Sequence, residues 1–340
     1  MQIIKPIIFS MLLVLVLLVC STGDTFANTI PELNTVNIGD YKTTSRAQIR
    51  RCIIGYRTFG SLNADKSNVV LWPTWFGGTS EDLFTANTLV NSMDTKGLYV
   101  IVVDALANGV SSSPSNTRHF PDITIRDMVN TQHELLVKHL GIHHLKAVIG
   151  ISMGGMQAHE WSVAYPTFMD KVIAIVGSPK QSAFDILVWQ TQVDLITNAG
   201  TDKQQQDFAL KKAHDIFYMH ATTPTDFAQR VDPDKLQQYM AQKYQNMKNG
   251  MDYMISAKAM IKHDIYKSAG VLPSNIQRLI KADLLMIISD QDHLVNPLSS
   301  IALAKTLKRK VVILKGNNGH TAPFIQTAEV FAATSAFLKL

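Results

Sequence analysis

Ser152 lies in the sequence GISMG (150–154), which has the G-x-S-x-G form. This form is typical of a sharp turn between a buried strand and a helix, where it holds a serine hydroxyl clear of the backbone as a nucleophile. The apolar run 145–149 predicts the strand, and residues 157–164 predict the helix, which ends before Pro166. So short a pattern also occurs by chance, and the alternative is a glycine-rich turn that happens to contain a serine.

A serine hydroxyl is a poor nucleophile at neutral pH and needs a base, together with an acidic residue that orients the base. Behind a turn of this kind the partners come later in the chain, in the order Ser, Asp, His. His320 follows the apolar run 310–314 within the glycine-rich loop 315–323, which is the expected place for the base. The alternative is a surface histidine, since the chain has eleven histidines.

The loop 289–297 leaves the apolar run 282–288 and offers two aspartates, Asp290 and Asp292. We predict Asp292 as the acid because Leu-Val-x-Pro (294–297) comes just after it and places it at the tip of the loop. Asp290 is the alternative, or it is a loop residue bonded to nearby backbone amides. Ser152, Asp292 and His320 together form the predicted catalytic triad.

The negative charge that develops on a substrate oxygen needs two fixed hydrogen-bond donors. We predict the backbone N–H of Met153, next to the nucleophile, and the backbone N–H of Trp75, in the loop after the strand 68–71. The alternative for Trp72 and Trp75 is that both simply pack in a wall. The segment 104–111 is expected to shape the floor of the pocket and is assigned no chemistry.

The composition excludes several other functions. The chain has 340 residues and a formal net charge of +5, and its basic residues are scattered, which argues against a nucleic-acid surface. His133-Glu134 followed by His139 is not a metal-binding H-E-x-x-H pattern, and neither a P-loop nor a dinucleotide fingerprint is present. We therefore expect no metal and no cofactor.

The N-terminus has the plan of a secretory signal. Lys5 precedes the apolar stretch 7–20, and a polar segment then ends at Ala27. We predict that residues 1–27 are a cleaved signal peptide, which implies a periplasmic or secreted protein with no stable membrane partner. An uncleaved anchor is the alternative. Cys52 is the remaining cysteine, and it is expected to be packed rather than reactive.

Strands and helices alternate after residue 50, which predicts an α/β fold with a mostly parallel central sheet covered by helices on both faces. Thr124, with Asp127 three residues later, predicts a capping box at the start of a helix.

The catalytic domain is expected over residues 28–340. Within it, residues 178–272 show helical runs and several methionines, which predicts a helical cap whose methionines pack helices or shape an acyl pocket. The predicted strands are 68–71, 98–103, 145–149, 171–176, 282–288 and 310–314, and the predicted helices are 80–93, 124–140, 157–164, 183–197, 204–217, 225–230, 234–243, 251–263, 298–307 and 327–338.

The segment GISMGGMQAHEW (150–161) resembles the homoserine O-acetyltransferase family of α/β-hydrolases, which has S-M-G-G-M-Q and then E-W at this place. Residues 249–264 are similar to that family's cap helix. Asp292 with its Leu-Val-x-Pro and the pair Gly319-His320 match its acid and histidine loops. The resemblance implies an α/β-hydrolase fold with a helical cap, and ping-pong acyl transfer through an acyl-Ser152 intermediate.

The chain also departs from that family. It has no arginine between Ser152 and Arg230, where the family's transferases hold the amino-acid carboxylate, and the family's H-A-L-T-G loop is replaced by PTWFG (73–77). Export would also separate the protein from acetyl-CoA. We therefore predict an ester hydrolase acting on a small-molecule acyl ester. An O-acetyltransferase using an acyl donor and a non-catalytic binding protein are the alternatives, and a homodimer is left open.

Overall fold

Eight strands form one sheet, in the order β1-β4-β6-β5-β7-β8-β9-β10. The computed structural model describes residues 30–85, 95–247 and 249–339. The chain divides into residues 1–30 and a second unit, residues 31–340, which holds the sheet. The predicted signal peptide lies outside the described residues. The strands of this sheet are β1 (Asn34–Asn37), β4 (Ile53–Gly60), β5 (Val69–Pro73), β6 (Tyr99–Val103), β7 (Leu145–Ile151), β8 (Met169–Ile175), β9 (Asp283–Ser289) and β10 (Val311–Leu314).

The sheet is mostly parallel, as the sequence predicted. The neighbouring pairs from β6 through β10 are all parallel, whereas β1 and β4 run antiparallel to their neighbours. A separate antiparallel pair is formed by β2 (Tyr41–Lys42) and β3 (Gln48–Ile49). Because β7, β8, β9 and β10 are parallel and adjacent, the loops that leave their carboxyl ends meet at one edge of the sheet.

Helices cover both faces of the sheet, and successive strand residues pack against different layers. Val148 belongs to the core on the face of α3 (Ile125–Glu134) and α4 (Met153–Ala164), whereas Ile149 belongs to the core on the face of α14 (Thr327–Lys339). On the first face α12 (Leu298–Leu307) also packs. On the second, α1 (Asp82–Thr85) is the described part of the predicted helix 80–93, because residues 86–94 lie outside the described residues.

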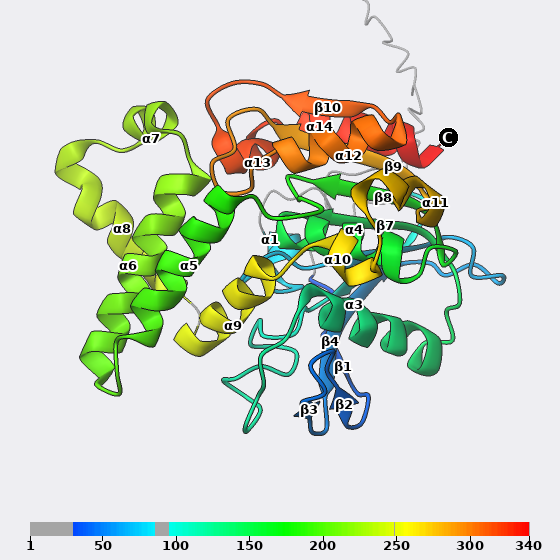
Figure 1. Cartoon of the computed structure of the whole chain (residues 1–340), viewed down its shortest axis with the longest axis horizontal. Coiled ribbons are helices and arrows are strands. Elements are labelled where there is room, and N and C mark those ends of the chain that lie inside the picture. The colour runs from blue at the N-terminus through cyan, green and yellow to red at the C-terminus, as the bar shows by residue number, and fades with distance from the viewer. Residues whose placement is uncertain (1–29, 86–94, 248, 340) are drawn as a thin grey trace, which may run out of the picture. The chain divides into compact units, whose positions relative to one another are not determined.

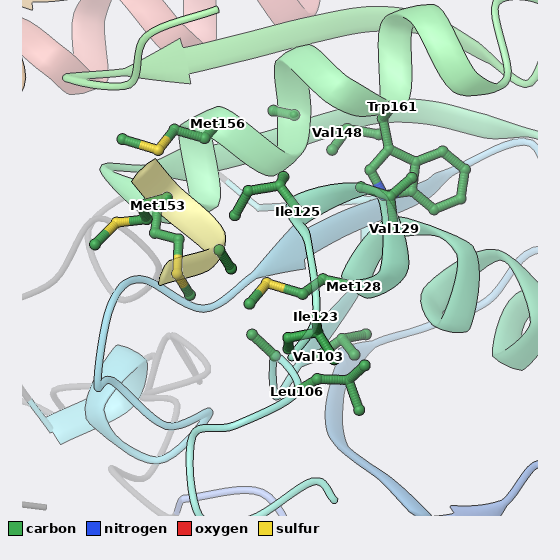
Figure 2. Packing of buried hydrophobic residues seen from close by; sticks show 14 of the residues in the cluster. Val103, Leu106, Ile123, Ile125, Met128, Val129, Val148, Met153, Met156 and Trp161 are labelled. Carbon is green, nitrogen blue, oxygen red and sulfur yellow. The ribbon is translucent and has the colours of Figure 1, made fainter. Parts of the chain in front are cut away.

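The packing of α4 on α3 fixes the helix that follows Ser152. Figure 2 shows Met153, Met156 and Trp161 of α4 facing Ile125 and Met128, and these side chains are at most 1% exposed. Burial of such side chains stabilises the fold by roughly 1.5–3 kcal/mol each. The predicted capping box is present, because the Thr124 side chain accepts from the Asp127 N–H and the Asp127 side chain accepts from the Thr124 N–H. The helix then continues as a π-helical turn over Leu135–His139.

Between β8 and β9 the described chain forms helices and no named strand. Figure 1 shows α5 to α9 gathered on the left of the view, beside the sheet. Met240, Met254 and Met260 are buried in this block, whereas Met219 and Met251 are exposed, so some of its methionines pack helices and others face solvent. The helices are α5 (Ala183–Thr197), α6 (Lys203–Ala221), α7 (Pro224–Arg230), α8 (Leu236–Gln245), α9 (Gly250–Ile261), α10 (Ile265–Ala269) and α11 (Ile276–Leu279).

Two further sequence features can be placed. Cys52 is fully buried, and burial raises the pKa of its thiol to about 12, so it is a packed side chain as expected. Across residues 30–85, 95–247 and 249–339, the helices are too short or too polar to cross a membrane.

The turn at Ser152 tolerates no side chain at Gly150, which gives a stability prediction. A Cβ built on Gly150 would lie 2.0 Å from the carbonyl oxygen of Gly154, a backbone atom that cannot move aside alone. We expect Gly150→Ala to lower the free energy of unfolding by about 3 kcal/mol, as overpacking does elsewhere.

Gly250→Ala is the matched control, because a Cβ at Gly250 would meet nothing closer than a Leu210 methyl at 3.9 Å. This change should alter stability by less than about 1 kcal/mol. Urea denaturation of both variants measures the difference, and equal stabilities would contradict the packing described for the turn.

Candidate active site

Ser152 occupies the turn between β7 and α4 in a strained backbone conformation. Its φ is 56° and its ψ is −120°, which is outside the regions that non-glycine residues normally adopt. The turn is held by a hydrogen bond from the Ser152 N–H to the Ile175 carbonyl oxygen, 2.8 Å long. Gly154 and Gly155 allow α4 to approach β5 and the end of β8, since a Cβ on Gly154 would lie 2.6 Å from the Pro73 oxygen. The conformation is that of a nucleophile turn.

The structure brings Ser152, His320 and Asp292 together. The His320 Nε2 lies 2.8 Å from the Ser152 Oγ, and the His320 Nδ1 lies 2.7 Å from the Asp292 Oδ2. A carboxylate only accepts hydrogen bonds, so Nδ1 carries the proton, and Nε2 of the neutral ring accepts from the serine hydroxyl. This is the arrangement in which an imidazole can take the serine proton while a carboxylate holds the ring in the correct tautomer.

Asp292 and not Asp290 is oriented toward the histidine. Asp292 is buried, and its Oδ1 accepts hydrogen bonds from the backbone N–H groups of Leu294 (2.9 Å) and Val295 (2.8 Å), which leaves Oδ2 for His320. Asp290 has an exposed side chain, and its backbone N–H donates to the Leu314 carbonyl oxygen. The backbone amides of Leu294 and Val295, in the same loop, therefore orient the Asp292 carboxylate.

The acid loop is also attached to the first cap helix. Asp185 closes the capping box of α5 with Ser182, and its Oδ1 accepts from the backbone N–H of Asn296, 3.1 Å away. Burial raises the pKa of the Asp185 carboxyl and outweighs the hydrogen bonds from Ser182 and Asn296, which favour its charged form. On the other side, a Cβ on Gly319 would lie 3.0 Å from the Ala221 oxygen, so α6 also contacts the histidine loop. The cap thus contacts the two loops that carry Asp292 and His320.

The two predicted oxyanion donors lie on segments that touch each other. Met153 is the first residue of α4, where backbone N–H groups have no partner within the helix. The Trp75 N–H has no hydrogen-bond acceptor within the described part of the chain. Gln157 of α4 donates to the Thr74 carbonyl oxygen at 3.0 Å, which joins the two segments. Trp72, by contrast, is fully buried in the core, in agreement with the alternative that it simply packs in a wall.

A cavity of about 820 Å³ opens above Ser152 and His320. Ala107 and Asn108 line it, so the segment 104–111 borders the pocket as expected. Most of the remaining wall comes from the cap, and its polar or aromatic members include Trp189, His214, Tyr218, Arg230, Lys243 and Tyr253. No cluster of three or more potential metal ligands is found within the described residues.

Sequence reasoning missed the cap side chains because they come from five helices with no shared spacing. It also missed Gln157, which reads in the sequence as an ordinary helix residue although it accepts from Gln132 and holds the Trp75 loop. The spacing of Ser182 and Asp185 is that of a capping box, which indicates a helix start. It does not indicate the hydrogen bond that Asp185 accepts from the Asn296 N–H.

The orientation of the two aspartates yields a test that needs no knowledge of substrate. We expect Asp292→Asn to slow the labelling of Ser152 by a fluorophosphonate about 1000-fold, because an amide in place of the carboxylate no longer holds the correct tautomer of His320. Asp290→Asn is the matched control and should label at the wild-type rate. Labelling rates are read from gel fluorescence over time, and a reversed order of the two variants would contradict the assignment of the acid.

Two curated enzymes are similar to this chain in sequence. The chain is 37% identical over 171 residues to an ethyl acetate hydrolase of Pseudomonas veronii, a match that covers 48% of each chain, so it spans about half the length of that relative. It is 26% identical over an alignment of 356 residues to a homoserine O-acetyltransferase of Methanosalsum zhilinae, which covers 88% of this chain and 71% of the other.

A solved structure of an acetylester hydrolase from Corynebacterium glutamicum superposes with a TM-score of 0.82, covering 91% of this chain and 96% of that one. Their identity is 21%, so this likeness shows the fold alone. The family model described as alpha/beta hydrolase fold matches residues 68–326, which is more than half of the chain. The chain therefore belongs to the α/β-hydrolase family.

Proposed function

We propose that this chain is a serine ester hydrolase that acts on short acyl esters through an acyl-Ser152 intermediate. The observation that carries the proposal is the continuous hydrogen-bond chain from the Ser152 Oγ through His320 to Asp292, at 2.8 Å and 2.7 Å. The match to an ethyl acetate hydrolase supports an ester as the substrate class.

The reaction follows from the positions of these groups. His320 takes the hydroxyl proton as the Ser152 Oγ attacks the ester carbonyl, and the N–H groups of Met153 and Trp75 stabilise the negative oxygen. His320 then gives the proton to the leaving alcohol. In the second half a water molecule loses its proton to His320 and attacks the acyl-serine, which releases the acid and restores the free hydroxyl.

The second candidate is an O-acetyltransferase, in which an alcohol replaces water in the second half. Two observations favour it. The first is the match to a homoserine O-acetyltransferase over most of the chain. The second is Lys243 in the cavity wall, a cation for the carboxylate of an amino-acid acceptor, which lies over the rings of Tyr218 and Tyr239. Arg230, also in the wall, is engaged by Asp226 through its Nε (2.9 Å) and its Nη2. Because its charge is already compensated, Arg230 is poorly suited to hold the carboxylate of an amino-acid acceptor, which leads us to place hydrolysis first.

Turnover of short esters by residues 28–340 tests the enzyme proposal. We expect Ser152→Ala to lower kcat by at least about 10⁴-fold, because the acyl-enzyme cannot form. Release of the alcohol and the acid is followed by chromatography. Failure of wild-type protein to hydrolyse any member of a short-ester panel, together with no fluorophosphonate labelling of Ser152, would favour a binding protein on a hydrolase scaffold.

An assay of the same purified protein with an alcohol acceptor distinguishes hydrolysis from acyl transfer. With acetyl-CoA and homoserine added, hydrolysis predicts that free acetate forms faster than O-acetylhomoserine. The opposite order would assign the chain to the transferases. Competition between water and a series of alcohols for an acetyl-enzyme made from a simple acetate ester measures the ratio of hydrolysis to transfer without acetyl-CoA.

We also propose that the enzyme is exported and that its signal is cleaved after Ala27. The proposal is supported by the basic, apolar and polar regions of residues 1–27. Expression of the full chain in a Gram-negative host should give a periplasmic protein whose N-terminal residue is Asn28. An intact N-terminus on a membrane-bound or cytoplasmic protein would contradict it.

A further inference from the structure

His214 of α6 is a titratable side chain in the wall of the cavity that the proposed reaction does not use. Both of its ring nitrogens are buried, and neither has a hydrogen-bond partner among the described residues. A buried polar group without a partner costs about 1–3 kcal/mol, so such groups are rare in folded proteins and require an explanation.

The imidazole of His214 is neutral at neutral pH. Burial lowers its pKa to about 4, while the nearby Asp215 carboxylate has a smaller, opposite effect. A neutral imidazole has one donor and one acceptor nitrogen and no charge. It therefore matches a hydroxyl, which also donates and accepts, or a carbonyl, and it offers nothing to balance a carboxylate.

The surroundings of His214 are aromatic. Its ring centroid lies 5.1 Å from that of Tyr253, and the Phe76 ring lies 4.7 Å from both Tyr253 and Trp189. All four residues line the cavity that contains Ser152. Trp189 repeats the pattern of His214, because its Nε1 is buried without a partner among the described residues. One wall of the pocket thus holds two uncharged polar groups whose partners are not supplied by the described protein.

We infer that His214 is a substrate-binding residue that determines specificity, and that it selects esters carrying an uncharged hydrogen-bonding group, such as a hydroxyl, in the acyl or alcohol part. The inference rests on the proposed ester hydrolysis at Ser152 and deepens it by naming a substrate class. The substrate hydroxyl donates to the unprotonated ring nitrogen of His214 or accepts from the protonated one, because the two nitrogens point in different directions and one hydroxyl bonds only one of them. An ester with a methyl group in the same position leaves both nitrogens unpaired, which lowers its kcat/KM.

Two pairs of isosteric esters test this inference. Ethylene glycol monoacetate and propyl acetate differ by a hydroxyl in the alcohol part, and ethyl hydroxyacetate and ethyl propanoate differ by a hydroxyl in the acyl part. The measured quantity is the ratio of kcat/KM for the hydroxylated ester to kcat/KM for its partner. Comparison of this ratio between variants cancels the intrinsic reactivity of each ester.

His214→Phe and His214→Leu both remove the hydrogen-bonding nitrogens and keep an apolar side chain. We expect each to lower the ratio about 10-fold or more in at least one pair, while His214→Gln, which keeps a donor and an acceptor, retains part of it. The matched control is His220→Phe, on the same helix, since the Nδ1 of His220 is already bonded to the Ile216 oxygen and His220 is not among the cavity-lining residues.

The outcomes separate this inference from the proposed function. Ratios that stay within about threefold of wild type in both pairs for both apolar variants, with normal labelling of Ser152, would overturn the role of His214 and leave the hydrolase intact. That result would mean that His214 packs in the cavity wall without binding the substrate. Absence of turnover of all four esters by the wild type, with unlabelled Ser152, would overturn both.

Discussion

The short hydrogen-bond chain from Ser152 through His320 to Asp292 is the interaction on which the remaining features of the site depend. Its members are far apart in sequence, since 168 residues separate the serine from the histidine. They meet because β7, β9 and β10 belong to one parallel part of the sheet, whose carboxyl ends share an edge. A shift of about 1 Å in any of these strand ends would weaken the proton transfer that the arrangement permits.

Backbone packing around the serine supports this interaction. The positive φ of Ser152 is tolerated because the turn is held by the hydrogen bond to Ile175 and by the close approach of Gly155 to Gly177. Gln157 extends the same constraint to the loop that carries Trp75. The nucleophile and its proposed oxyanion donors are therefore positioned by one element, α4, which packs on α3.

Much of the chemistry could be predicted from the sequence because it follows strands at fixed points. Ser152 directly follows a buried apolar run, whereas Asp292 and His320 lie in the loops that follow two later apolar runs. The structure places all three in one hydrogen-bond chain. The helix 183–197 was predicted with the bounds that the structure shows, and the capping box predicted at Thr124 and Asp127 is present, because both are local signals. The cap wall could not be predicted, because residues such as His214 meet the cavity only through packing between separate helices. The same limit applies to Asp185, whose bond to the Asn296 N–H joins segments that are distant in sequence.

The most direct measurement of the central claim is mass spectrometry of the protein after rapid mixing with 4-nitrophenyl acetate and acid quenching. The account predicts that the peptide containing Ser152 gains the mass of one acetyl group during turnover, and that this peptide stays unmodified in His320→Ala. Turnover with no acylated Ser152 peptide, or with the acetyl group on another residue, would contradict it.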